Sequence, residues 1–222
     1  MGCAGAALVL VKIMKKEKKM KFLTNIYAAI TIIGSRESSE EALARLTHVA
    51  QMAAEIGLVL RSGGAVGADS VVTKLHWARR EIFIPWKGYE NFHHNPKRGI
   101  YLLEKLPEKE VARKLALQIH PAEHLKESHT KLMARNIYQI TGPEKIGIDP
   151  DTYKLLEGVD RAHLSRIVVF AAPTGRQGQV LGGTRLAVDF ARKMGIKYYN
   201  VLKLKDYRIV VNFLEYLVKK LS

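Results

Sequence analysis

Short runs of apolar, β-branched residues alternate with helical patterns along this chain, and a Gly-rich turn directly follows three of those runs. Residues 167–171, Ile-Val-Val-Phe-Ala, have the continuous apolar character of a strand that is buried on both faces. Strands that alternate with helices favour βαβ units and a parallel sheet. We therefore predict an α/β fold with a doubly wound, mostly parallel, Rossmann-like sheet that carries helices on both faces.

This alternation predicts five strands and six helices. The strands are expected at residues 26–33, 58–61, 81–85, 167–171 and 197–202. The helices are expected at residues 40–57, 70–80, 108–118, 122–140, 184–193 and 209–221. Ser38 or Ser39 is the expected N-cap of the first helix, because short hydroxyl side chains bond the free N–H groups of a first turn.

Residues 87–153 break the alternation, and we expect a mid-chain insert of helices and loops there. The rest of the chain from residue 20 onward forms one domain of residues 20–222 around that insert. Residues 1–19 run from apolar to basic, which is the reverse of a secretory signal, so a disordered extension or an upstream start is predicted. No apolar run reaches the roughly 18 residues that a membrane span needs.

The chain is strongly basic, with a formal net charge of +15. Residues 1–21 carry six lysines and one glutamate, so they supply +5 and leave +10 on the remainder. A basic body attracts phosphate-bearing partners, although a solvated cationic surface is the alternative. The single cysteine, Cys3, excludes an internal disulfide and a Cys-rich zinc site and is typical of a reducing compartment.

The three Gly-rich turns hold the candidate binding residues. Because parallel strands end at the same edge of a sheet, all three turns are expected to meet there, where ligands bind at the point of strand-order reversal. The candidate phosphate-binding residues are Gly34, Ser35, Arg36, Ser62, Gly63, Gly64, Ala65, Gly67, Asp69, Gly182, Gly183 and Thr184.

The residue types in these turns suit a phosphate. Glycines let backbone N–H groups approach an anion, and helix N-termini after Gly64 and Gly183 add partial positive charge. Arg36 offers a guanidinium fork, and Asp69 is a candidate acceptor for a sugar hydroxyl. The alternative is that the glycines only permit tight turns and that Asp69 bonds local amides. Neither the P-loop pattern nor Gly-x-Gly-x-x-Gly after the first strand is present.

The segments Ile33–Arg36, Arg61–Asp69 and Gly182–Thr184 together resemble the SLOG superfamily. That Rossmann-like group includes DNA-processing protein A and the LOG phosphoribohydrolases. The chain looks most similar to the DNA-processing-protein-A-like proteins of bacteriophages and prophages, also in residues 84–86, 120–121 and 134–136. The resemblance covers about residues 27–202. It implies a nucleotide or nucleic-acid phosphate bound over the turns, a bacterial or phage-infected host cytoplasm and a possible homodimer.

The resemblance also separates the binding branch from the hydrolase branch. LOG hydrolases carry Gly-Gly-x-Gly-Thr-x-x-Glu, and alignment of Gly183-Thr184 with that motif puts Ala187 at the position of the catalytic glutamate. Alanine neither donates nor accepts a proton, so binding is favoured over catalysis. An enzyme that cleaves a nucleotide N-glycosidic bond stays the alternative, with Asp69 or Glu37 as its carboxylate.

Three weaker signals lie in the middle of the chain. Trp86 follows the third predicted strand and is a candidate for base stacking, or for packing the insert against the sheet. Arg135 and Asn136 are candidate pocket residues, or a surface pair on a helix. His120 and His124 have a zinc-compatible spacing, but Pro121 lies between them, and polar histidines are favoured over a metal site.

Taken together, these observations favour a protein that binds a nucleotide or a single-stranded nucleic acid, with no cofactor, no metal and no membrane. Two other hypotheses stay open. One is the nucleotide N-glycosidase described above. The other is a sensor or sequestering protein for a signalling nucleotide, which would use the same pocket.

Overall fold

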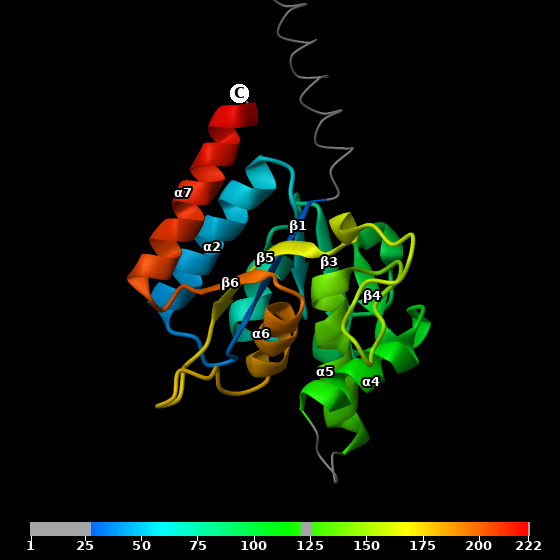
Figure 1. The fold of residues 1–222 in the computed structure, drawn as a ribbon. Helices are drawn as coiled ribbons and strands as arrows, with labels where there is room; N and C mark the ends of the chain where they lie inside the picture. The colour runs from blue at the N-terminus through cyan, green and yellow to red at the C-terminus, as the bar shows by residue number, and fades with distance from the viewer. Residues whose placement is uncertain (1–27, 121–125, 222) are drawn as a thin grey trace, which may run out of the picture.

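Six parallel strands form the single sheet of this protein, in a computed structural model that describes residues 28–120 and 126–221 (Figure 1). Their spatial order is β4-β3-β2-β1-β5-β6, and every neighbouring pair is parallel. The strands are β1 (Ala29–Gly34), β2 (Val59–Ser62), β3 (Arg80–Ile84), β4 (Ile100–Leu102), β5 (Ser165–Ala171) and β6 (Lys197–Asn200). The predicted extension of residues 1–19 lies outside the described residues.

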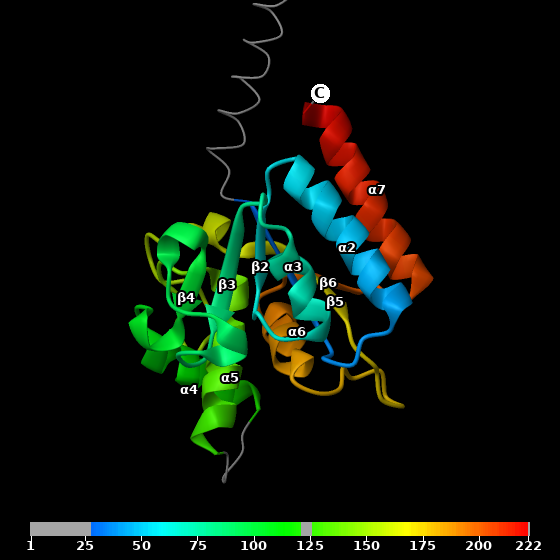
Figure 2. The same ribbon diagram turned by 180° about the vertical axis from the view of Figure 1, so that it is seen from behind.

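Helices cover both faces of the sheet, as the predicted doubly wound fold requires. Helices α2 (Glu40–Glu55), α3 (Ser70–Lys74) and α7 (Leu204–Leu221) pack on one face. Helices α4 (Lys109–Ile119), α5 (Glu127–Thr141) and α6 (Thr184–Lys193) pack on the other. Figure 2 shows α2 beside α7 on one side of the sheet and α4 beside α5 on the other. The predicted α/β fold class is confirmed.

Alternation within the strands produces the two cores. Side chains of successive strand residues point to opposite faces, so Ile32 packs toward α2 while its neighbour Ile33 packs toward α5 and α6. Both residues are almost fully buried. The first helix begins as predicted, because the Ser39 hydroxyl accepts a hydrogen bond from the Ala42 N–H.

Three elements differ from the sequence prediction. Residues 100–102 form strand β4 inside the segment expected to hold only helices and loops, because they pair with β3 at the sheet edge. Helix α3 ends at Lys74 instead of near Arg80, since its β-branched residues 71–73 propagate a helix poorly and the chain must extend into β3. Helix α7 begins at Leu204, five residues before the expected start.

The strand order reverses between β1 and β5. The chain proceeds outward from β1 through β2 and β3 to β4, and then returns to the other side of β1 with β5. The carboxyl ends of these two strands, Gly34 and Ala171, are register partners. This is the point at which α/β sheets of this kind open a crevice for ligands. Across the described part of the chain, no helix has both the length and the apolar character to cross a membrane.

Candidate functional site

The first Gly-rich turn lies tightly against the end of β5. The Ser35 N–H donates to the Ala171 carbonyl oxygen at 2.7 Å, and a Cβ on Gly34 would stand 2.3 Å from that same oxygen. No side chain fits in this space, so the end of β1 requires glycine. Arg36 follows with an exposed side chain, and its Nη2 donates to the Tyr89 hydroxyl at 2.9 Å. The turn therefore presents a guanidinium beside the reversal point.

The second turn, residues 62–69, packs beneath the first. Gly67 has a φ of +78°, and a Cβ on it would stand 2.5 Å from the Ser35 carbonyl oxygen. The Ala68 N–H donates to that same oxygen at 3.1 Å, and the Ser62 hydroxyl donates to the Asp69 carbonyl at 3.3 Å. This turn therefore supports the first one.

Asp69 joins both turns to helix α5. Its carboxylate accepts hydrogen bonds from the backbone N–H groups of Gly34 and Ala65, and Arg135 Nη1 donates to its Oδ2 at 3.2 Å. The residue is only 3% exposed. Burial raises the pKa of this carboxyl above its ordinary value, while Arg135 and the two N–H groups oppose the shift. This arrangement matches the alternative in which Asp69 bonds local amides, because three internal donors already occupy the carboxylate.

Helix α5 presents polar side chains to two of the turns. The Arg135 guanidinium fills the space over Gly63, where a Cβ would stand 1.0 Å from Nη1. Asn136 Nδ2 donates to the Gly183 carbonyl at 3.0 Å. With the Gln139 amide oriented to satisfy both of its ends, its oxygen accepts from Arg135 Nη1 and from the Gly63 N–H, each at 2.7 Å. Sequence analysis missed Gln139, although a position four residues after Arg135 is on the same helix face.

The third turn is open to solvent. Gly182 and Gly183 are exposed, and a Cβ on either would meet nothing within 4 Å. Thr184 is buried and begins α6, whose first turn therefore borders the open space. The unpaired N–H groups of a helix N-terminus carry partial positive charge and attract anions.

The first turn, the third turn and α5 enclose one cleft of about 910 Å³ at the reversal point, which we call the switch-point cleft. This volume lies within the range of about 300–1,000 Å³ that is usual for small-ligand sites. The predicted residues that line the cleft are Gly34, Ser35, Arg36, Ala65, Asp69, Arg135, Asn136, Gly182, Gly183 and Thr184. The predicted residues outside its lining are Ser62, Gly63, Gly64, Gly67 and Trp86.

Trp86 does not line the cleft but contacts Tyr89, which lies beside it. It is half-buried against the core on the α2 face, and its ring meets the Tyr89 ring edge-on at 5.1 Å between centroids. Tyr89 is nearly buried, and its ring lies 5.9 Å below the Arg135 guanidinium carbon while its hydroxyl accepts from Arg36. Tyr89 thus contacts two of the arginines that line the cleft, Arg36 and Arg135, and sequence analysis did not single it out.

The charge of the cleft comes from arginine. The hydrogen bond to Tyr89 raises the pKa of Arg36 above its ordinary value. Arg185, which sequence analysis also missed, lines the cleft with its Nε 3.3 Å from Asp189 Oδ2. Burial and the nearby Arg185 lower the pKa of His120, although Asp189 at 3.3 Å opposes the shift. Two exposed guanidinium groups therefore border the cleft, that of Arg36 and that of Arg185, which is paired with Asp189.

The zinc-compatible spacing of His120 and His124 can be compared with the structure. His120 lies beside Asp189, whereas His124 falls outside the described residues. Over residues 28–120 and 126–221, no three His, Cys, Asp or Glu side chains are grouped so as to hold a metal ion.

Ala187, at the position of the hydrolase glutamate, is fully buried in the core between the sheet and α6. Among the described residues, two carboxylates line the cleft, those of Glu37 and Asp69. Asp69 is engaged by three donors, while Glu37 is exposed. Neither arrangement is that of a carboxylate buried in a pocket and free to transfer a proton to a ligand.

Comparisons with known proteins identify the fold. No protein-family model matches the chain, and no curated protein sequence does. Among solved structures, the fold is similar to DNA processing protein A from Helicobacter pylori, which was described for its single-stranded DNA binding mode. The TM-score is 0.52 and the identity 16%, over 89% of this chain and 83% of that one.

DNA processing protein A from Streptococcus pneumoniae is a second similar structure, with a TM-score of 0.41 and 17% identity. The match covers 78% of this chain and 50% of that one, so the chain spans half the length of the pneumococcal protein. At 16% identity, the similarity to the Helicobacter pylori structure establishes a shared Rossmann-like fold, and function must be argued from the site.

Proposed function

We propose that this protein binds single-stranded nucleic acid through its phosphates in the switch-point cleft. One observation carries this proposal: two Gly-rich turns, the N-terminus of α6 and the guanidinium groups of Arg36 and Arg185 all border the same cleft. Backbone N–H groups and guanidinium groups are the donors that phosphate oxygens accept most readily. Asp69 and Arg135 form a buried ion pair, and Asp69 also accepts from the backbone of both turns.

Two further observations support a nucleic acid. The chain carries a net charge of +15, and +10 of it lies outside residues 1–21, so the domain itself is basic. The fold is that of DNA processing protein A, and the Helicobacter pylori protein of that fold was described for its single-stranded DNA binding. On the motif resemblance we also propose that the chain belongs to the SLOG superfamily, in its phage-type branch similar to DNA-processing protein A.

Fluorescence anisotropy of a labelled oligonucleotide tests the proposal directly. Arg36→Glu should weaken binding at least about tenfold, since it replaces a phosphate partner with a like charge. Lys197→Glu is the matched control, because Lys197 is exposed and stands at the other end of the sheet. Equal losses in both variants would contradict the assignment of the cleft.

A free nucleotide is the alternative ligand for the same cleft, either as a stored or as a sensed molecule. Salt dependence separates the two, because a strand releases a counterion for each neutralised phosphate. For a strand, log K should fall by about 0.7 per phosphate contact for each unit of log salt. A flat response together with tight mononucleotide binding would favour the nucleotide.

The N-glycosidase alternative has its own test. Nucleoside monophosphates are incubated with the protein, and released base is measured by chromatography. The binding proposal expects no base above the level of a Glu37→Gln and Asp69→Asn double variant. Release that depends on Glu37 or Asp69 would make the protein an enzyme.

We propose in addition that the chain forms a homodimer through α7. Ile209, Phe213 and Tyr216 are exposed to 40%, 38% and 53% and lie at i, i+4 and i+7 on that helix. Such spacing forms one apolar stripe. Light scattering should report a dimer that Phe213→Lys converts to a monomer, and a wild-type monomer at high concentration would exclude this interface.

A further inference from the structure

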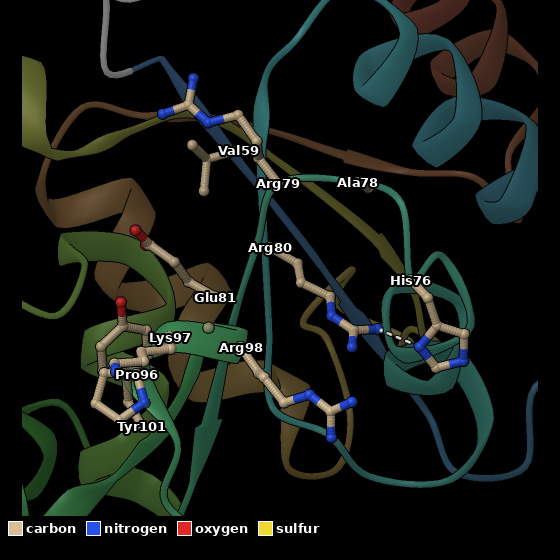
Figure 3. Close-up of a pocket in the computed structure, with 11 residues that line it drawn as sticks. Val59, His76, Ala78, Arg79, Arg80, Glu81, Pro96, Lys97, Arg98 and Tyr101 are labelled. Carbon is tan, nitrogen blue, oxygen red and sulfur yellow. Dashed lines mark hydrogen bonds between the residues drawn. The ribbon is translucent and has the colours of Figure 1, made fainter.

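A second groove, with a volume of about 520 Å³, lies at the amino ends of β2 and β3, beside β4 (Figure 3). We call it the amino-edge groove. Its basic lining residues are His76, Arg79, Arg80, Lys97 and Arg98. In Figure 3 the side chains of Arg80 and Arg98 extend toward the same side as His76.

This groove is separate from the switch-point cleft. Arg80 is the first residue of β3, whereas the cleft begins at Gly34, the last residue of β1. Strands of four to six residues separate the two ends of the sheet, which corresponds to about 15–20 Å. The two sites share no lining residue.

Among the described residues, no carboxylate forms an ion pair with Arg80, Lys97 or Arg98 of this groove. Its one lining carboxylate, Glu81, receives a buried hydrogen bond from Arg61 Nε at 2.7 Å. Arg80 Nη1 donates to the Thr73 carbonyl at 2.5 Å and lies 3.2 Å from His76 Nδ1, so neither contact supplies a negative charge. Burial lowers the pKa of Arg80, and the charge of Arg98 lowers it further.

Lys97 and Arg98 are exposed and form no ion pair with a carboxylate of the described residues. Like charges this close together repel one another, and a bound anion would relieve that repulsion.

The backbone holds these cations in place. Lys97 and Arg98 lie in a 3₁₀ turn, Pro96–Arg98, that Gly99 ends with a φ of +70°. A Cβ on Gly99 would stand 1.9 Å from the Arg80 carbonyl oxygen, and the Ile82 N–H donates to the Gly99 carbonyl at 2.7 Å. Only glycine permits this contact, which brings the turn directly onto β3.

An exposed aromatic residue, Trp77, lies between two lining residues of the groove in the chain. Trp77 is 62% exposed, and its chain neighbours His76 and Ala78 both line the groove. A large exposed indole beside a basic groove is the combination by which proteins hold single strands, with phosphates on the cations and a base on the ring. Tyr101 does not offer a second platform, since its ring stacks against Phe83 at 5.6 Å between centroids.

We propose that the amino-edge groove is a second contact for single-stranded nucleic acid, in which Arg80, Lys97 and Arg98 neutralise backbone phosphates and Trp77 stacks on a base. The inference rests on the proposed function for the class of ligand, but on different residues for the site. A strand long enough to extend from the switch-point cleft would engage both sites, whereas a short one would engage only one at a time.

Tryptophan fluorescence reports on this groove directly, because the chain has two tryptophans, Trp77 and Trp86. In a Trp86→Phe background the emission comes from Trp77 alone. Stacking on a base of a thymidine oligomer of about 24 nucleotides, longer than the roughly 4–16 nucleotides of one strand-binding module, should quench that emission. Binding seen by anisotropy with no change in Trp77 emission would overturn the proposal.

Charge reversal supplies the second measurement. The double variant Lys97→Glu and Arg98→Glu should weaken binding of the long oligonucleotide about tenfold or more. The slope of log K against log salt should become shallower by about 1.4, because two phosphate contacts are lost at about 0.7 each. The matched control is Arg166→Glu with Lys197→Glu. Both control residues are exposed at the amino ends of β5 and β6, which form the edge of the sheet opposite to β3 and β4. Equal losses in the two double variants would overturn the proposal.

Three outcomes distinguish a strand-binding groove from the alternative sites. If inorganic polyphosphate or a mononucleotide quenches Trp77 as strongly as the oligonucleotide at equal phosphate concentration, the groove is a small-anion site and the proposal fails. If Arg36→Glu leaves oligonucleotide binding intact while the double variant Lys97→Glu and Arg98→Glu abolishes it, the proposed site in the switch-point cleft is refuted and the amino-edge groove is supported as the binding site. If the wild type binds no oligonucleotide, both fail.

Discussion

The second and third Gly-rich turns are made of similar residues, yet the fold uses them in opposite ways. A Cβ on Gly63 would overlap the Arg135 guanidinium, whereas a Cβ on Gly183 would meet nothing within 4 Å. In the second turn Gly63 is buried under Arg135 of α5, the Gly63 N–H donates to Gln139, and the Ser62 hydroxyl donates to the Asp69 carbonyl. The third turn is exposed and borders the switch-point cleft. A Gly-rich turn therefore supports a site or presents groups to a ligand according to what packs over it.

Two arginines of the cleft, Arg135 and Arg36, differ in the same way. Arg135 is buried and paired with Asp69, while Arg36 is exposed and, among the described residues, donates to the neutral Tyr89 hydroxyl without an ion pair. A guanidinium whose charge is already matched inside the protein stabilises the fold, and one whose charge is unmatched is available to a phosphate. The following experiments test this division.

The largest expected effect is on stability, at Arg135. Arg135→Ala leaves the Asp69 carboxylate buried without its partner and should lower the free energy of unfolding by about 3–5 kcal/mol. Arg36→Ala should change it by less than about 0.5 kcal/mol, because that side chain is exposed. Urea unfolding followed by circular dichroism measures both.

A double variant provides the control for Arg135. Adding Asp69→Asn to Arg135→Ala removes the unpaired charge and should recover part of the lost stability. Similar stability losses from Arg135→Ala and Arg36→Ala would show that the two arginines do not differ as described.

The next effect compares two glycines. Gly34→Ala places a Cβ 2.3 Å from a backbone oxygen that cannot move aside without distorting β5 and should cost about 1–3 kcal/mol. Gly183→Ala should leave stability unchanged or raise it by up to about 1 kcal/mol, since its φ of −62° suits any residue. Thermal unfolding measures both, and equal shifts in Tm would contradict the contrast between the turns.

A smaller effect is expected at Tyr89. Tyr89→Phe removes the hydroxyl that accepts from Arg36 but keeps the ring beside Trp86 and Arg135. Oligonucleotide affinity should fall by about fivefold, equivalent to about 1 kcal/mol for one hydrogen bond. Anisotropy titration measures the change. Unaltered affinity would mean that Tyr89 does not position Arg36 for the ligand.

The smallest effect is a pH dependence at His120. Its pKa is lowered in the folded state, so the unfolded chain binds the proton more readily. Stability from this group is complete above the unfolded pKa of about 6.5 and is lost as the pH falls through the lower folded value. His120→Gln should therefore show a shallower loss of stability than the wild type between about pH 7.5 and pH 5. Parallel urea midpoints would exclude the contribution.

Much of the fold could be predicted from sequence, because the signals are local. The alternation of β-branched runs with helical patterns located five strands, and Ser39 was among the expected caps. Strand β4 was not predicted, because three residues carry too little periodicity to indicate a strand. Pairing with β3 is what makes these residues extended. The early end of α3 was not predicted for a related reason: the chain must extend to reach β3, and this overrides the local helical character.

The candidate site could be predicted only in part. The Gly-rich motifs pointed to the first and third turns, and the family resemblance pointed to Arg135 and Asn136 on α5; all of them line the cleft. Tyr89, Gln139 and Arg185 were missed because their roles depend on partners far away in sequence. That Asp69 is occupied by internal donors was likewise open, since its Arg135 partner lies 66 residues away.

Residue order alone thus determined the layered α/β architecture and the meeting of glycine turns at one sheet edge, because strand period, capping and glycine's freedom act over a few neighbouring residues. Only the tertiary structure decided which turn opens to solvent, which arginine keeps an unmatched charge and that a basic groove forms at the opposite edge. Those outcomes depend on burial and ion pairing between distant segments, and a linear pattern does not encode which charged groups end up buried together.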